Sequence, residues 1–205
     1  MKTGGNFFVR AWRTLWRPGS LSMGALMLIG FAGGVAFWGG YNWTMELSND
    51  ESFCISCHEM RDNVYQEYLK TPHAKNPSGV KVSCADCHVP KQWIHKFIRK
   101  ITATNELFHK VAGTINSREK FIANREKMAL NVWRSMKATD SRECRNCHDF
   151  AVMDIKKQKK VAKKKHPGAK KENQTCIECH KGIAHELPEG WGPNSPLPED
   201  KKSAG

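Results

Sequence analysis

One short motif, Cys-x-x-Cys-His, occurs four times and constrains this chain more than any other feature. The copies are 54–58, 84–88, 144–148 and 176–180. This spacing is typical of c-type haem attachment, in which both thiols add to the haem vinyl groups and the histidine ligates the iron. The chain has eight cysteines, and all of them belong to these motifs: Cys54, Cys57, Cys84, Cys87, Cys144, Cys147, Cys176 and Cys179. We therefore predict four covalently bound haems and no disulfide.

Other roles for paired cysteines explain the pattern less well. A thioredoxin-like redox motif needs a single Cys-x-x-Cys near a β-α-β pattern. Structural zinc sites use paired Cys-x-x-Cys knuckles, but they give no reason for a histidine directly after each pair. A disulfide scaffold is typical of short secreted chains. The four motif histidines are thus expected to be the proximal iron ligands: His58, His88, His148 and His180.

The N-terminus predicts a membrane anchor. Covalent haem attachment takes place outside the cytoplasm, so the chain must be exported. Residues 1–17 carry four basic and no acidic residues, and residues 18–45 carry no charge. This stretch is long enough to span a bilayer, and bulky aromatic residues stand where signal-peptide cleavage requires small ones. The positive-inside rule then predicts a cytoplasmic segment at 1–17 and an uncleaved single-pass anchor at 18–43, in the bacterial inner membrane.

The rest of the chain is expected to form one periplasmic domain packed around its haems. The first cysteines of the motifs stand at 54, 84, 144 and 176, so the gaps are 30, 60 and 32 residues. We therefore expect a tetrahaem domain at 44–190, with dihaem modules 44–90 and 138–187, a helical insert 91–137 and an irregular tail 191–205. Asn116 with Glu119 resembles a helix cap inside the insert. No stretch alternates with a period of two, so we predict a mainly α fold with little or no β structure.

Two isolated histidines are placed alike in the two modules. His73 stands 11 residues before Cys84, and His166 stands 10 before Cys176. Four irons each have a second axial position to fill, and histidine or methionine usually fills it. The duplicated placement therefore favours His73 and His166 as distal ligands.

The remaining candidates are less evenly placed. His185 follows His180 too closely to bind the same iron, so it is expected to reach a neighbouring haem. Met60 follows the first motif, and a thioether can also ligate iron, which leaves His58 and Met60 as alternatives at the first haem. Two further histidines, His95 and His109, are weaker candidates because they fall in helical segments.

The charge of the chain is less extreme than it first appears. The formal net charge is +13, and eight haem propionates would lower it to about +5 (13 − 8). Nucleic acid is not an expected partner of an exported haem protein. Nine lysines lie between Lys156 and Lys171. They form either a solvated loop or a docking surface for an acidic redox partner.

Taken together, these residues resemble the NapC/NirT family of membrane-anchored tetrahaem quinol dehydrogenases. The resemblance covers about residues 10–190 and includes the anchor, Cys-His-Glu-Met at 57–60 and Cys-His-Lys-Gly-Ile-Ala-His at 179–185. The presence of His166 makes the branch that serves periplasmic nitrate reductase the most similar. The resemblance implies that membrane quinol is oxidised near the first haem. Electrons then pass along the haems to a periplasmic reductase or soluble cytochrome.

The resemblance also implies a quinol site. In the family, a lysine and a carboxylate six or seven residues later follow the second motif, and Lys100 and Glu106 match them. Lys100 would bond a quinol oxygen, and Glu106 would take the released proton. Some relatives have a histidine where this chain has Lys91, so one sixth ligand stays open between Lys91, His95 and an empty position.

Two other functions remain alternatives at this point: an anchored electron carrier without a quinol site, and a reductase of a small oxyanion. The sequence also leaves open whether the protein forms a homo-oligomer.

Overall fold

The computed structural model describes residues 7, 9–10, 12, 19 and 21–198. They form two compact units, one ending at Glu46 and one beginning at Leu47. The first contains all but the last residue of α2 (Met23–Leu47), a helix of 25 residues with no acidic residue in its first turn and no basic residue in its last turn. At 1.5 Å per residue it is about 37 Å long, enough to cross a bilayer. By length and composition this helix could cross a membrane, and the anchor expected at 18–43 stays a prediction, while most of the expected cytoplasmic segment lies outside the described residues.

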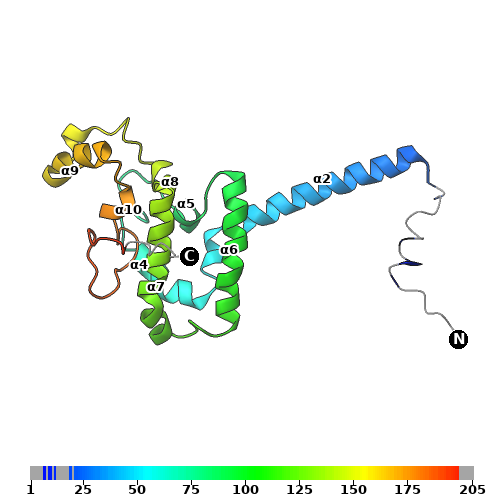
Figure 1. The fold of residues 1–205 in the computed structure, drawn as a ribbon, viewed down its shortest axis with the longest axis horizontal. Helices are drawn as coiled ribbons and strands as arrows, with labels where there is room; N and C mark the ends of the chain where they lie inside the picture. The colour runs from blue at the N-terminus through cyan, green and yellow to red at the C-terminus, as the bar shows by residue number, and fades with distance from the viewer. Residues whose placement is uncertain (1–6, 8, 11, 13–18, 20, 199–205) are drawn as a thin grey trace, which may run out of the picture. The chain divides into compact units, whose positions relative to one another are not determined.

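The second unit is built only from helices and loops within the described residues, which confirms the mainly α prediction (Figure 1). Its elements are α3 (Glu51–Cys54), the π-helix η1 (Met60–Val64), α4 (Tyr65–Tyr68), α5 (Cys84–His88), α6 (Trp93–Val111), α7 (Arg118–Ala138), α8 (Arg142–Arg145), the 3-10 helix η2 (Ile155–Lys157), α9 (Lys160–Lys171) and α10 (Cys176–Cys179). The predicted tail is irregular as far as residue 198.

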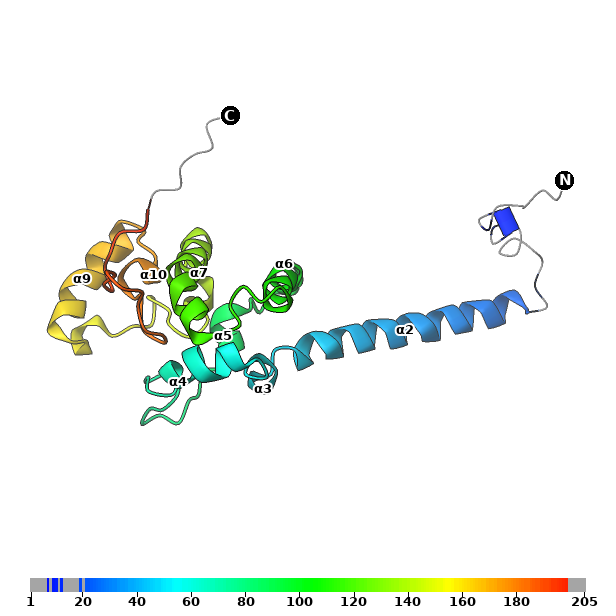
Figure 2. The same cartoon turned by 90° about the horizontal axis from the view of Figure 1, so that it is seen from below.

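The two long helices of the insert both stand upright in Figure 1 and are joined by a short turn, and Figure 2 shows them nearly end-on. Helix α7 begins one residue later than predicted. Its N-cap is Ser117, whose hydroxyl accepts a hydrogen bond from the Lys120 amide at 3.4 Å. Asn116, the predicted cap, instead accepts from the Lys120 ammonium at 2.8 Å. Both residue types cap helices well, and here the serine has the extended backbone that a cap requires.

The protein core of this unit is small. Among its described residues, the buried apolar side chains are Tyr68, Phe121, Trp133 and Ile177, together with Pro90 and Pro188. A domain of this length needs far more buried apolar area to fold. Large apolar groups that are not amino-acid side chains must therefore complete the core, and covalently bound porphyrins fit that need.

A buried ion pair joins distant parts of the unit. Arg125 on α7 donates to both carboxylate oxygens of Glu67 on α4, and it also donates to the Glu186 carbonyl at 3.0 Å. The Glu186 amide in turn donates to Glu67 at 2.9 Å. Burial alone would raise the pKa of Glu67, but the hydrogen bonds from Arg125 and the Glu186 amide, with the charges of Arg125 and His185, together outweigh it, so the pKa is lowered. The network fixes the segment that carries His185.

Candidate haem sites and quinol site

Each Cys-x-x-Cys-His motif lies at a short helix, which explains how the two thiols come to lie close together. In α5, Asp86 stands between the two cysteines and accepts from the Ser83 amide at 2.8 Å and from its hydroxyl at 2.7 Å. Glu178 makes the same capping box with Thr175 at α10. A residue inside the motif thus holds the turn that brings its two cysteines together. None of the eight cysteines is bonded to another cysteine.

The four motifs follow one another in space in the order of the chain. Helix α3 packs against α5, and α5 packs against α8. The last step is made by Ser141, which is fully buried and accepts a hydrogen bond from the Ile177 amide at 3.1 Å. Ser141 has a left-handed backbone (φ 48°), which turns the chain from α7 into the third motif. The arrangement places the four attachment points in one continuous row.

Three motif histidines face a second histidine. The ring centres are 6.2 Å apart for His88 and His185, 6.3 Å for His148 and His73, and 6.0 Å for His180 and His166. A metal between two imidazoles needs bonds of about 2 Å, and with roughly 1.1 Å from nitrogen to ring centre this gives about 6.2 Å. The pairs therefore fit one iron each. They unite the three distal histidines predicted from the sequence with three of the predicted proximal ones.

Other contacts orient these rings. The Nδ1 atom of His166 lies 2.6 Å from Gln158 Oε1, and that of His185 lies 3.2 Å from the Val64 carbonyl. Such contacts leave Nε2 free for a metal. Burial and the neighbouring His185 lower the pKa of His88 to about 4, so its ring is neutral, as a ligand must be. Among the described residues, no group of three or more His, Cys, Asp or Glu side chains could hold a metal ion.

Two of the three pairs join the predicted modules to one another. His73 of the first module meets His148 of the second, and His185 of the second meets His88 of the first. Only His166 and His180 pair within a module. The two modules therefore interlock, and residues from Leu47 onward form one compact unit.

The first motif differs from the other three. The His58 side chain is 52% exposed and its Nε2 lies 3.3 Å from Glu59. Met60 is half-buried and opens the π-helix η1, a rare local geometry that is frequent at functional sites. Glu59 is 2% exposed, and the Lys110 ammonium donates to its carboxylate. Among the described residues, no histidine ring pairs with His58, so both His58 and Met60 remain predictions here.

The weaker candidates do not complete this first site. Lys91, His95 and His109 are all exposed. His109 Nδ1 lies 3.3 Å from the Thr114 hydroxyl, and its ring packs against Phe108. Within the described part of the chain, none of these three side chains pairs with a motif histidine.

Lys100 lies beside the start of the domain. Its ammonium donates to the Ser48 hydroxyl at 2.8 Å and to the Ser48 carbonyl at 3.0 Å. Ser48 directly follows the anchor helix. Before haem is attached, a hydrogen bond from Cys84 lowers the pKa of the free Cys54 thiol to about 7, and the charge of Lys100 contributes to the same shift. Lys100 therefore lies close to the first haem-attachment motif.

Glu106 is placed differently from Lys100. Its carboxylate forms an ion pair with Arg99 at 2.8 Å and is 65% exposed. A carboxylate that the sequence did not single out lies nearer to the first motif. Glu51 accepts from Tyr65 at 2.9 Å and from Lys81 at 2.8 Å, both at Oε1. Its Oε2 is buried without a hydrogen-bond partner. The position of Glu51 three residues before Cys54 was the signal that could have pointed to it.

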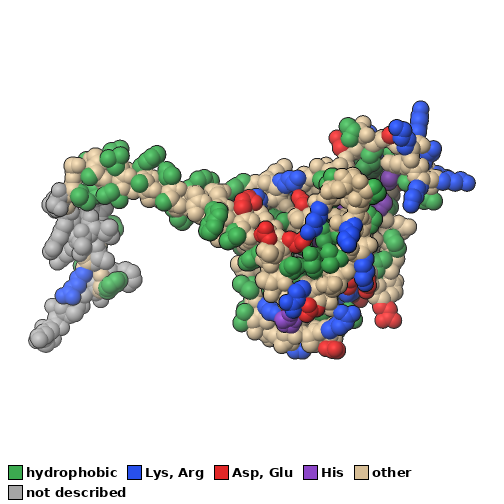
Figure 3. All heavy atoms as spheres, turned by 180° about the vertical axis from the view of Figure 1, so that it is seen from behind, with side chains coloured by type: hydrophobic (Ala, Val, Ile, Leu, Met, Phe, Trp, Pro, Cys, Tyr) green, Lys and Arg blue, Asp and Glu red, His purple; other side chains and the backbone are tan. Residues whose placement is uncertain are grey.

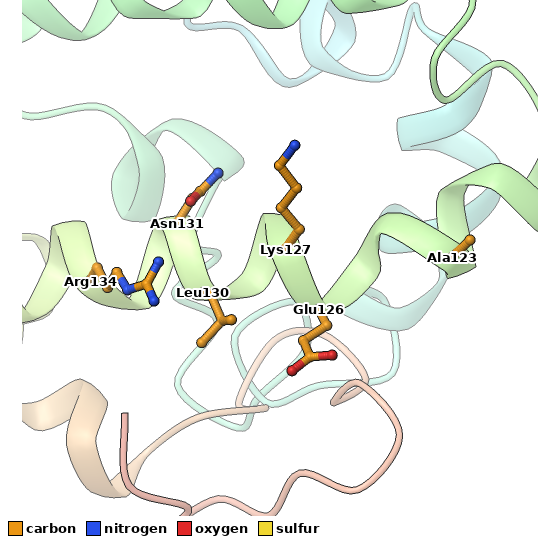
Figure 4. Close-up of a pocket in the computed structure, with 6 residues that line it drawn as sticks. All are labelled: Ala123, Glu126, Lys127, Leu130, Asn131 and Arg134. Carbon is orange, nitrogen blue, oxygen red and sulfur yellow. The ribbon is translucent and has the colours of Figure 1, made fainter. Parts of the chain in front are cut away.

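A shallow hollow of about 250 Å³ runs along α7 (Figure 4). Its lining residues come from this one helix: Ala123, Glu126, Lys127, Leu130, Asn131 and Arg134. They include no histidine or cysteine, so we assign it no part in the haem or quinol sites.

Comparison with known proteins gives a single answer. The model of the NapC/NirT cytochrome c family, N-terminal region, matches residues 17–190. NapC of Escherichia coli is 54% identical over 180 residues, which cover 88% of this chain and 90% of the relative. The denitrification system component NirT of Stutzerimonas stutzeri is 52% identical over 177 residues, covering 86% and 88%. A protein of Allochromatium vinosum named as a tetraheme cytochrome c type is 47% identical over 158 residues, covering 77% and 85%. No solved structure matches.

Proposed function

Because the chain belongs to the NapC/NirT cytochrome c family, as its motifs predicted, we propose that this electron-transfer protein is a quinol dehydrogenase. It oxidises membrane quinol and delivers the electrons to a periplasmic reductase, with nitrate reductase the expected partner. It is held in the inner membrane by a single helix. The observation that carries the proposal is Lys100, which links α6 to Ser48 directly after the anchor and lies beside Cys54. Six residues, 48–53, lie between Leu47 and Cys54.

The haem-binding part of the proposal assigns four c-type haems. Three would be held between His88 and His185, His148 and His73, and His180 and His166, and the first by His58 or Met60. When bound, the haems supply one-electron redox chemistry. The protein orients ligand rings through contacts such as those of His166 and His185, and it brings the attachment helices together in the order of the chain.

The quinol part of the proposal concerns protons. Quinol oxidation releases two protons, so the site needs acceptors near the quinol oxygens. Lys100 would hydrogen-bond one oxygen, and Glu106 would accept a proton once its ion pair with Arg99 opens. Glu51, with an unpartnered buried oxygen, is the alternative acceptor.

Reduction of the purified, full-length protein by a water-soluble quinol analogue tests this function. We expect Glu106→Gln to slow reduction by quinol about 100-fold, while dithionite still reduces all haems at the native rate. The exposed Glu189→Gln is the matched control. If Glu51→Gln is slow and Glu106→Gln is normal, the acceptor is Glu51 and the assignment of Glu106 is wrong. If quinol does not reduce the native protein, the chain is an anchored carrier and not a dehydrogenase.

The partner side of the proposal rests on α9. This helix supplies His166 to the fourth site and carries most of the nine lysines from 156 to 171, all of them exposed. Lysine and arginine side chains project at this end of the domain (Figure 3). Of these nine lysines, Lys157 forms an ion pair within the described residues, with Asp154 at 3.6 Å. A surface of this charge steers acidic redox proteins toward the fourth site.

Salt dependence tests the partner side. Lys160→Glu/Lys163→Glu should slow oxidation of the dithionite-reduced protein by an acidic monohaem cytochrome about tenfold at low ionic strength. Lys70→Glu/Lys127→Glu changes the net charge equally at exposed sites elsewhere and is the control. Equal slowing by both variants would mean that only total charge matters and that α9 is not the docking surface.

A further inference from the structure

Helix α6 is amphipathic, and its apolar face is the exposed one. Within this helix no residue is buried. Its large apolar side chains recur at three-, four- and seven-residue spacing along one face and are between 50% and 81% exposed: Ile94, Ile98, Ile101, Phe108 and Val111. A surface helix of a soluble domain has the opposite arrangement, with its apolar stripe turned toward the core.

The polar face of α6 makes the contacts with the domain. Arg99 donates to the His88 carbonyl at 3.3 Å. Lys100 donates to Ser48, and Lys110 donates to the buried Glu59. These three contacts lie on one side of the helix, and the side that carries Ile94, Ile98 and Ile101 is opposite to it by the helical repeat. The apolar face therefore points away from the domain.

The haem-attachment motifs lie on the polar side of the helix. Lys100 bonds Ser48, which lies six positions before Cys54 of the first motif, and Arg99 bonds the backbone of His88 in the second motif. Porphyrins attached at these motifs are thus on the side of α6 that faces the domain. They do not account for the exposed stripe on its outer face.

The contact of α6 with the residue after the anchor helix indicates that membrane lipid covers the apolar face of α6. Lys100 is hydrogen-bonded to Ser48, the residue directly after α2, so this part of α6 lies at the level where the chain leaves the bilayer. A helix with apolar residues on one face and lysine, arginine and histidine on the others is the kind that lies flat in a membrane surface. Trp93, which stacks on Phe97 at 5.7 Å between ring centres, stands at its first turn and is suited to the headgroup region.

We propose that α6 lies in the surface of the membrane with its apolar face among the lipid acyl chains. This inference rests on the proposed anchor and deepens the proposed quinol site. Lys100 stands at the border between the two faces of the helix. A quinol molecule dissolved in the bilayer would reach the Lys100 ammonium along the apolar face of α6, without crossing bulk water.

Photocrosslinking in native membranes tests the proposal on the full-length, haem-loaded protein. The photoreactive residue p-benzoylphenylalanine replaces Ile98 or Phe108 in separate variants. Phe31 of the anchor is the positive position, and Ile122, an exposed apolar residue of α7, is the matched negative position. We expect at least about tenfold more phospholipid adduct, by mass spectrometry, at Ile98 and Phe108 than at Ile122.

The other outcomes of this experiment would overturn the proposal, each in a different way. Lipid adducts at Phe31 but not at Ile98 or Phe108 would overturn the proposal and leave the anchor intact. Adducts between two copies of the chain at Ile98 would show that the face is an oligomer interface, and they would also overturn it. No lipid adduct at Phe31 would refute the anchor and the proposal with it. Quinol reduction is measured on the same variants. The lipid adducts then test the position of α6, and the reduction rate tests the quinol site separately.

Discussion

Removing the Arg125 guanidinium should destabilise the domain through one identifiable ion pair. In Arg125→Ala, Glu67 stays in a site where its side chain is 8% exposed but loses both hydrogen bonds from the cation. Breaking a buried pair on one side costs about 3–5 kcal/mol. For a chain of this size, that corresponds to a fall in Tm of about 6–20 °C. The measurement is thermal unfolding of the haem-loaded protein, followed by circular dichroism.

The pH dependence of this effect has a definite sign. The folded pKa of Glu67 lies below its unfolded value, so its contribution to stability is present above the unfolded pKa of about 4.3 and is lost as the pH falls through the folded pKa. The difference in Tm between native protein and Arg125→Ala should therefore shrink in acid. Lys127→Ala, on the exposed side of the same helix, is the control and should melt like the native protein.

Two results would refute this reasoning. A fall of less than about 2 °C at neutral pH would mean that the pair contributes little net stability. A difference that does not change with pH would mean that lost packing on Phe121, which lies 5.3 Å from the Arg125 guanidinium, is the cause. Arg125→Met with Glu67→Leu should recover much of the loss, since apolar residues often replace a buried pair without cost.

The other predictions follow from the haem sites and the anchor. The intact mass should exceed that of the polypeptide by four haems, and a mass with two haems would contradict the motif assignment. N-terminal sequencing of the mature protein should start before α2, and a start after residue 35 would show that the anchor is cleaved. Alanine at any of the three predicted distal ligands should convert one low-spin haem to high spin, and an unchanged spectrum in a folded variant would remove that residue from the ligand set: His73, His166 and His185.

The sequence predicted the features that depend on residues close together in the chain. These features are the four attachment motifs, the helices of the insert and the anchor. In each of them the spacing of neighbouring residues is enough for a prediction. The cap of α7 was misplaced by one residue because Asn116 and Ser117 are both good caps. The buried pair of Glu67 and Arg125 was missed, since its partners lie 58 residues apart and no local pattern links them.

The histidine pairings could not be predicted from local patterns either, because the paired residues lie far apart in the chain. They also indicate why we expect the fold to depend on haem. His73 and His148 are 75 residues apart (148 − 73), and His88 and His185 are 97 apart (185 − 88). Closing loops of this length costs chain entropy, and the few buried apolar side chains of the domain cannot offset that cost. One iron between each pair would close the loop at a fixed distance, and a porphyrin would fill the space that apolar side chains leave. The sequence therefore indicates which histidines are available, while their pairing depends on residues far apart in the chain, and we expect bound haem to hold the pairs together.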